Sequence, residues 1–420
     1  MRLLSSSLIG FASFVLAASS TVEIVQQGTE IDLVEEQLPP QESSLEAEGI
    51  VRFPRMPAVL QSVLHEDWKT LGVDDILDQL KSPGVLEFAH GRGTFYSHLV
   101  GTYGILKAWN QPDDICKLGM THTAYGGDLF QFFLWDSLNQ RDSLQAIIGE
   151  EAEALTILFG TINRGQLGGL EYVMNGEITK MEPLAGNYTV KHRIDDTVVV
   201  PAKTAAKILM ATVADYLDQM VEENGWRDHH QVEAVVDRLY PGDGRPTIAF
   251  YWFSQVLRSI RDQLDVVPAI FDSCTKTISY QDELLARDLY WNVTLHEFDL
   301  TEQQQINLLY QSISHNPYIG EPHLLLAQLY FRKKEYQQAG LHCRRALQKM
   351  YTLASAWDKR RTYAQWVGFT RILLLRINRY IQGQPHLPYY DQSNSAYDTA
   401  KGLHLTSLHD IAKEMKAFEE

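Results

Sequence analysis

The sequence is poor in cysteine and in positive charge, and each shortage excludes a class of protein. Only Cys116, Cys274 and Cys343 occur in 420 residues. They are too few for a disulfide framework or a cysteine zinc cage, although one disulfide is possible. The 37 lysines and arginines face 53 aspartates and glutamates, which gives a formal net charge of −16. Because such a chain repels phosphates and anionic lipid, we expect no nucleic-acid partner.

Several common catalytic motifs are also missing. Gly91-x-Gly93 precedes an expected helix but lacks the strand and the third glycine of a dinucleotide site. The sequence has no phosphate-binding Gly-x-x-x-x-Gly-Lys-Ser/Thr loop, no Gly-x-Ser-x-Gly elbow and no His-Glu-x-x-His helix. These absences argue against a kinase, a dinucleotide-binding enzyme and a serine hydrolase.

Long apolar runs are confined to the first residues. Arg2 precedes an apolar stretch from Leu3 to Leu16, and Val15-Leu16-Ala17 resembles a signal-peptidase site. We therefore expect residues 1–17 to be a signal peptide that directs the chain to the secretory pathway or the exterior. The alternatives are a disordered leader and the outer half of a bipartite organelle signal. No later stretch reaches about 18 apolar residues, so the mature chain is expected to contain no membrane span.

What remains is the composition of a globular, mainly helical chain. Its 45% apolar and 21% charged residues are typical of folded proteins, and its length exceeds the ~250 residues at which single cores stop growing. We expect a disordered leader at 18–56, a helical domain at 57–230, a helical connector at 231–285, a second helical domain at 286–384, and a tail at 385–420 with a terminal helix. Within the first domain, residues 170–200 favour a short hairpin, and Ala205 to Met220 favours a helix.

A 34-residue period in the second domain predicts paired helices. Ala327, Tyr330, Ala339 and Ala346 occupy positions 8, 11, 20 and 27 of a unit that begins at Gly320. Tetratricopeptide repeats need small or flat side chains at these positions. The region is therefore interpreted as tetratricopeptide-like helical hairpins, and the alternative is an unrelated helical hairpin with the same pattern.

The densest potential chemistry lies in two histidine-containing segments. His98 is expected to open one helix and His122 to close the next, 24 residues later, with Pro112 at the start of the second helix. Two antiparallel helices joined by a short turn would bring these imidazoles side by side. Asp215 lies on a later expected helix, and imidazoles with a carboxylate suit one divalent ion such as Zn, Fe or Mn. A purely structural role for both histidines is the alternative.

At these residues the chain resembles the HD superfamily of metal-dependent phosphohydrolases, which are all-helical. His98 matches the first histidine of the pattern, His122 the histidine of the His-Asp pair, and Asp215 the late aspartate. The segments His90-Gly91-Arg92-Gly93-Thr94-Phe95 and His122-Thr123-Ala124-Tyr125-Gly126 look most like an uncharacterised branch, a domain of unknown function. The resemblance covers about residues 80–225, so we expect an HD-like domain followed by the tetratricopeptide-like domain.

The sequence departs from the superfamily at one ligand. Thr123 stands where the paired aspartate is expected, and a neutral hydroxyl is a poor substitute for a carboxylate. Asp128 is a possible replacement that Gly126-Gly127 would let fold back, but it is equally suited to cap a helix from Leu129 to Leu138. Asp218 is expected to be a solvated helix residue.

Two functions remain open. The resemblance implies a histidine-lined pocket in which His98, His122 and Asp215 hold a metal, Asp215 also orients water, and Arg92 neutralises the charge of a small phosphorylated substrate. Arg92 and His90 could instead order the loop before the helix. The other function is a catalytically inactive scaffold that binds a protein partner through a groove near Tyr330, Tyr336 and Trp366.

Overall fold

The structure, a computed structural model, is built mainly from helices. It describes residues 49–81, 83–90, 93–127, 133–136, 139–178, 180–219, 246, 249–268, 270, 277–383, 413 and 415–419. Two short antiparallel two-stranded sheets accompany the helices. The predicted mainly α fold class is confirmed. The predicted signal peptide, most of the predicted leader and most of the predicted tail lie outside the described residues.

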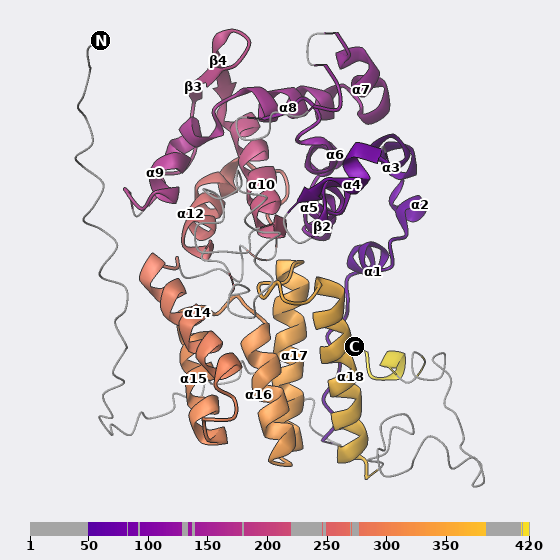
Figure 1. Ribbon diagram of the computed structural model, residues 1–420, viewed down its shortest axis with the longest axis vertical. Helices are drawn as coiled ribbons and strands as arrows, with labels where there is room; N and C mark the ends of the chain where they lie inside the picture. Colours follow the sequence, from indigo (N-terminus) through magenta and orange to yellow (C-terminus); the bar gives the residue numbers. More distant parts are fainter. Residues whose placement is uncertain are drawn as a thin grey trace, which may run out of the picture. The chain divides into compact units, whose positions relative to one another are not determined.

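Helices and short strands up to residue 263 form the first part of the described chain (Figure 1). In order they are α1 (Ala58–Leu64), α2 (Trp68–Leu71), α3 (Asp74–Leu80), α4 (Pro83–Glu87), β1 (Ala89–His90), β2 (Gly93–Thr94), α5 (Phe95–Ala108), α6 (Asp113–Thr121), α7 (Arg141–Ile148), α8 (Glu150–Thr161), η2 (Arg164–Gly169), α9 (Leu170–Met174), β3 (Asn187–His192), β4 (Asp196–Pro201), α10 (Ala202–Gln219), α12 (Phe250–Ile260) and η5 (Arg261–Gln263).

Helix α10 is the centre of this part. It packs against α5, α6, α8 and α12, and residues from Ala205 to Leu217 are buried on every side except at Lys207. Such all-round burial is possible because alanines let neighbouring helices approach closely; they are Ala205, Ala206, Ala211 and Ala214. The helix predicted at 205–220 and the hairpin predicted within 170–200, now β3 and β4, are confirmed as far as the residues are described.

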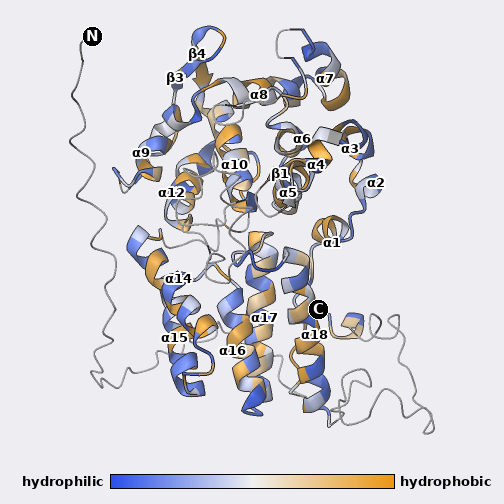
Figure 2. Ribbon diagram, viewed as in Figure 1, coloured by the Kyte–Doolittle hydropathy of each residue, from blue (hydrophilic) through white to orange (hydrophobic). Residues whose placement is uncertain are grey.

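Five further helices lie side by side, each packed on the next (Figure 1). They are α14 (Tyr280–Leu295), α15 (Glu302–His315), α16 (Glu321–Arg332), α17 (Tyr336–Leu353) and α18 (Tyr363–Ile381). Hydrophilic and hydrophobic colours alternate along α16, α17 and α18, as expected for helices that bury one face (Figure 2). Ala327, Ala339 and Ala346 are fully buried within this layer. The tetratricopeptide interpretation stays a prediction.

Packing is continuous between the two parts of the chain. The carboxylate of Glu283 in α14 accepts hydrogen bonds from the backbone N–H groups of Ala249, Phe250 and Tyr251 at the start of α12, each 2.7 Å long. One hydrophobic cluster runs from Val73 to Trp357. The boundary predicted between residues 285 and 286 falls inside α14, and the division of the chain into domains stays a prediction.

The end of the predicted disordered leader is ordered, which corrects that part of the prediction. Val51 is buried and exchanges two hydrogen bonds with the side-chain amide of Asn378 in α18, at 3.0 and 2.9 Å. Phe53 is fully buried and forms a parallel bridge with Glu419 near the other end of the chain. These apolar side chains were overlooked because acidic and polar residues dominate the surrounding sequence.

The groove predicted near Tyr330, Tyr336 and Trp366 is not an exposed aromatic surface. Trp366 is buried, and its indole N–H donates to the backbone oxygen of Asp358 at 2.7 Å. Tyr336 packs against Tyr380. The prediction is wrong for Trp366 because its side chain fills the space between α18 and the loop that precedes it.

Two buried histidines, His323 and His342, lie next to each other among α15, α16 and α17. The Nδ1 atoms of His323 and His342 are 3.1 Å apart, and His342 Nε2 lies 3.0 Å from the hydroxyl of Tyr310. Burial lowers the pKa of His323 well below its usual value and that of His342 to about 3. Both imidazoles are therefore neutral in the folded chain near pH 7.

Because burial lowers the pKa of both imidazoles, we predict that acid destabilises the fold. An unfolded imidazole titrates near 6.5, so the unfolded chain binds protons first as the pH falls. The stability that the neutral pair provides is complete above about pH 6.5 and is lost progressively below it. Denaturant unfolding at pH 7 and pH 5 should show a smaller decrease in unfolding free energy for His342→Gln than for the wild type. Equal decreases would contradict the prediction.

Candidate metal centre

The start of α5 places His98 on a buried face. Thr94 Oγ1 accepts a hydrogen bond from the backbone N–H of Ser97 at 3.1 Å, and Ser97 Oγ accepts from the N–H of Thr94 at 2.9 Å. This reciprocal capping box satisfies two backbone donors that a helix start leaves without partners. His98 follows in the first turn and is only 4% exposed.

The end of α6 places His122 beside it. His122 follows Thr121 as the C-terminal capping residue, and its Nδ1 lies 2.8 Å from the backbone oxygen of Gly119. Gly119 also permits the close approach of α5, because a Cβ atom there would collide with Leu106. The two imidazole rings are perpendicular, with centroids 5.2 Å apart. The predicted positions of His98 and His122 at neighbouring helix ends are confirmed.

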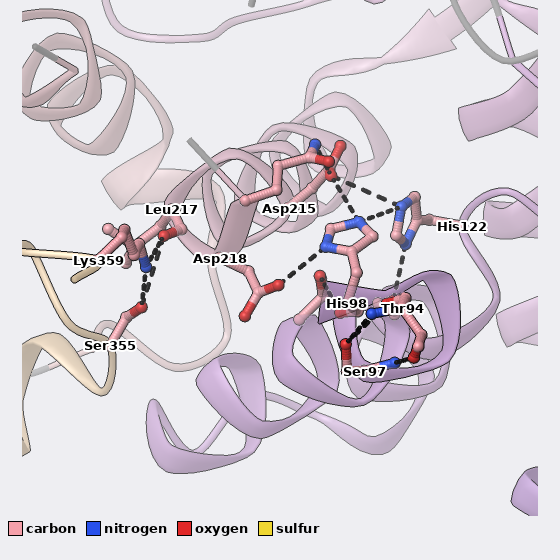
Figure 3. Close-up of polar contacts among 12 residues, drawn as sticks. Thr94, Ser97, His98, His122, Asp215, Leu217, Asp218, Ser355 and Lys359 are labelled. Carbon is pink, nitrogen blue, oxygen red and sulfur yellow. Dashed lines mark hydrogen bonds and ion pairs between the residues drawn. The ribbon is translucent and has the colours of Figure 1, made fainter. Parts of the chain in front are cut away.

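Helix α10 supplies the third group. Asp215 Oδ1 lies 3.2 Å from His98 Nε2 and 3.6 Å from His122 Nε2, and the two Nε2 atoms are 3.3 Å apart. Figure 3 shows both imidazoles turned toward the Asp215 carboxylate. His122 and Asp215 are 2% and 4% exposed. The structure thus brings together the three residues that the sequence proposed as metal ligands.

In each imidazole, Nδ1 makes a hydrogen bond outside the centre, and Nε2 faces Asp215. The carbonyl of Gly119 can only accept, so His122 Nδ1 carries the proton and its Nε2 presents a lone pair. The Asp218 carboxylate, 2.9 Å from His98 Nδ1, likewise accepts from that nitrogen. Two imidazole nitrogens and one carboxylate oxygen therefore face one another, an arrangement that needs a positive charge at its centre.

In the metal-free chain a proton on His98 supplies this charge. Burial alone would lower the pKa of His98, but hydrogen bonds to Asp215 and Asp218 raise it to about 9. Burial lowers the pKa of His122 to about 4. Burial would raise the pKa of Asp215, but His122, His98 and Arg164 hold it below its usual range. Near pH 7 the centre therefore holds one imidazolium, one neutral imidazole and one carboxylate.

The donor set also fits a divalent ion. Ligand atoms at ~2.0–2.1 Å from a tetrahedral zinc lie about 3.3 Å from one another, close to the three separations between these atoms. Their chemistry, two imidazoles and one carboxylate, suits Zn, Fe or Mn. Among the described residues, this is the one group of three such side chains whose ligand atoms converge within 4.8 Å. The centre can hold a metal ion of undetermined identity.

Asp218 has a role that the sequence did not reveal. Its side chain is 23% exposed and its oxygen accepts from His98, so it is neither a ligand nor a purely solvated residue. A carboxylate at this position fixes the orientation of a ligating imidazole and raises its basicity. Gly101 on α5 makes room for it, because a Cβ atom there would collide with Asp218 Oδ1. The spacing of Asp215 and Asp218, three residues apart on one helix face, was the available signal.

Arg164 is the second residue that sequence reasoning missed. Its Nη1 lies 3.6 Å from Asp215 Oδ2 and donates to Thr212 Oγ1 at 3.2 Å. The guanidinium stacks over the ring of Phe159, 3.9 Å from its centroid, and the side chain is 15% exposed. Arg164 follows α8 after a short turn, and no local sequence pattern links it to a position beside α10.

Two residues with expected roles cannot be placed. Arg92, the predicted partner of substrate charge, and Asp128, the possible replacement ligand, both lie outside the described residues. Residues 133–136 are described and are not helical, which corrects that part of the helix expected at 129–138. Thr123 Oγ1 is buried without a hydrogen-bond partner among the described residues. Among the residues that the structure describes, no further carboxylate joins His98, His122 and Asp215.

Comparison with known proteins finds one segment that is similar to a family model. Residues 79–164 match the model of a domain of unknown function, DUF6817. The match includes His98 and His122 and ends before Asp215. Searches of curated proteins and of solved structures found no significant match. The relation to the HD superfamily and the tetratricopeptide interpretation stay predictions.

The hydrogen bond between His98 and Asp218 predicts that a substitution of Asp218 lowers the affinity for metal. Asp218→Asn keeps the size of the side chain but removes the charge that orients His98, so affinity for Zn²⁺ should fall about 10- to 100-fold. Competition with a chromophoric chelator measures this affinity. The exposed Asp262 offers a control, and Asp262→Asn should bind as the wild type does. An unchanged affinity in Asp218→Asn would exclude the orienting role.

Proposed function

We propose that this chain holds one divalent ion at His98, His122 and Asp215 and hydrolyses a small phosphorylated molecule, as a divergent metal-dependent phosphohydrolase. The observation that carries the proposal is the convergence of two imidazole nitrogens and one carboxylate oxygen at a buried point. Three protein ligands are typical of catalytic rather than structural zinc sites, which usually have four. The resemblance of the motifs around His98 and His122 to the HD superfamily supports the same activity.

Each ligand has a defined task in this proposal. His98 and His122 present Nε2, because Asp218 and Gly119 accept from their Nδ1 atoms. Asp215 contributes a carboxylate oxygen that also accepts a hydrogen bond from Gln219 at 2.7 Å. A divalent ion held by these groups would lower the pKa of water toward ~7 and so make it a nucleophile for phosphorus. Asp215 would also orient the attacking water.

Arg164 is the described residue best suited to bind the substrate. Its guanidinium carries five N–H donors. The Nη1 atom contacts Thr212 and Asp215. The partly exposed remainder can donate to the oxygens of a phosphoryl group and neutralise its charge. Arg164 thereby takes the role that the resemblance implies for Arg92, which lies outside the described residues.

Thr123 favours a second candidate function, an inactive scaffold. The hydroxyl has no hydrogen-bond partner among the described residues and cannot supply the charge of an aspartate. In this alternative the buried centre stabilises the domain, and the C-terminal helices bind a protein partner.

No helix in the described part of the chain is long and apolar enough to cross a membrane. A secretory or extracellular destination, or an organelle reached through a bipartite signal, remains part of the proposal.

Metal content separates the two candidates. Purified wild-type protein should carry about one equivalent of Zn, Fe or Mn, and His122→Ala should lose it, because two ligands seldom retain a divalent ion. Elemental analysis and circular dichroism are the measurements. His65→Ala, a change at an exposed histidine, should keep the metal. Folded wild-type protein that binds none of the three metals, even when they are added, would refute the enzyme.

A second test addresses the substrate. Active protein should hydrolyse some member of a panel of phosphomonoesters and nucleotides. Arg164→Met should lower kcat/KM about 100-fold or more, the usual effect of removing a donor to developing charge, and should leave the metal content unchanged. A variant with wild-type kcat/KM would show that Arg164 does not contact the phosphoryl group.

A further inference from the structure

Two residues of the loop between α17 and α18 contact α10 near Gln219, its last described residue. Lys359 Nζ donates to the backbone oxygen of Leu217 at 2.8 Å and to Ser355 Oγ at 2.8 Å. Ser355 Oγ itself lies 3.5 Å from the same oxygen. Figure 3 shows Lys359 and Ser355 meeting at Leu217, on the same helix as Asp215 and Asp218.

These contacts act on the backbone of α10 itself. Leu217 lies two residues before Gln219, the last described residue of the helix. The ammonium of Lys359 places a positive charge on the carbonyl oxygen of Leu217. Leu217 lies between the two functional carboxylates, so movement of its carbonyl moves Asp218 relative to His98.

The loop that carries Lys359 is itself fixed. The backbone N–H groups of Trp357 and Asp358 donate to Glu321 Oε1 at 2.8 and 3.1 Å. Asp358 is fully buried and bound by Arg360 and by the hydroxyl of Tyr290. Lys359 therefore links the position of this loop, which joins α17 to α18, to Leu217 of α10.

The helix that bears His98 is attached to the same region. Trp109 caps the C-terminal end of α5, and its indole N–H donates to the backbone oxygen of Thr352 in α17 at 3.1 Å. Residues 352–359 thus contact both helices that supply the pair formed by His98 and Asp218. This arrangement limits movement of α5 and α10 relative to each other.

We propose that Lys359 is a positioning residue for the metal centre. By binding the carbonyl of Leu217, it keeps Asp218 within hydrogen-bond reach of His98 and so fixes the His98 ring. The C-terminal helices are, on this view, part of the centre's support rather than an independent module. The inference rests on the proposed function only where metal affinity is concerned, because the hydrogen bond between His98 and Asp218 exists without metal.

The test compares two substitutions at Lys359. Lys359→Met keeps the alkyl stem and removes the ammonium, whereas Lys359→Arg keeps a positive donor. In the metal-free protein, the downfield proton NMR signal of His98 Nδ1–H should broaden or shift in Lys359→Met and return in Lys359→Arg. Zn²⁺ affinity should fall about tenfold in Lys359→Met, the lower end of the effect expected for groups that orient ligands.

Arg371→Met provides the matched control. Arg371 binds Glu419 and the hydroxyl of Tyr351, so its loss removes a polar contact of α18 without touching α10. The control should keep both the NMR signal and the affinity. A wild-type signal in folded Lys359→Met, or an equal loss in Arg371→Met, would overturn the inference. Wild-type protein that binds none of Zn, Fe and Mn would refute the proposed function, and the NMR comparison would still decide the role of Lys359.

Discussion

The constraint on which this structure depends is a carboxylate buried against two imidazoles. Asp215 is 4% exposed, and burying such a charge alone would be very unfavourable. The cost is offset by His98 and His122 at one carboxylate oxygen, and Arg164 adds a positive charge beside the other. These residues come from α5, the end of α6 and the turn after α8, so the centre forms only when all of these elements pack on α10.

The requirement explains why α10 is held along its whole length. At its start, β4 runs directly into the helix, and the N–H of Ala202 donates to the backbone oxygen of Gly186 at 2.9 Å. Along its middle, buried alanines allow α5, α6, α8 and α12 to approach. Near Gln219, its last described residue, Lys359 binds the carbonyl of Leu217. Local packing and contacts from distant parts of the chain therefore serve the same helix.

The sequence predicted the parts of this arrangement that depend on local patterns. Helix start and stop signals placed His98 and His122 at neighbouring ends of α5 and α6, and apolar periodicity located α10. Asp218 and Arg164 escaped because their roles arise from contacts across more than 40 residues of chain. Val51 escaped for the same reason, because its partner Asn378 lies in α18, far along the chain. Trp366 was misjudged although the loop that it contacts directly precedes its own helix.

The missing aspartate changes the charge of the proposed centre in a direction that matters for its substrate. Asp215 and Asp218 bring two negative charges and Arg164 brings one positive charge. Two neutral imidazoles and a divalent ion would then leave the loaded centre with a net positive charge, whereas an aspartate at position 123 would cancel it. A buried site with excess positive charge attracts anions strongly, because little water screens it. Under the proposed function, Thr123 in place of an aspartate therefore lowers the affinity for the metal but strengthens the attraction of a phosphorylated molecule. Asp218 partly restores the metal affinity because it orients the ring of His98.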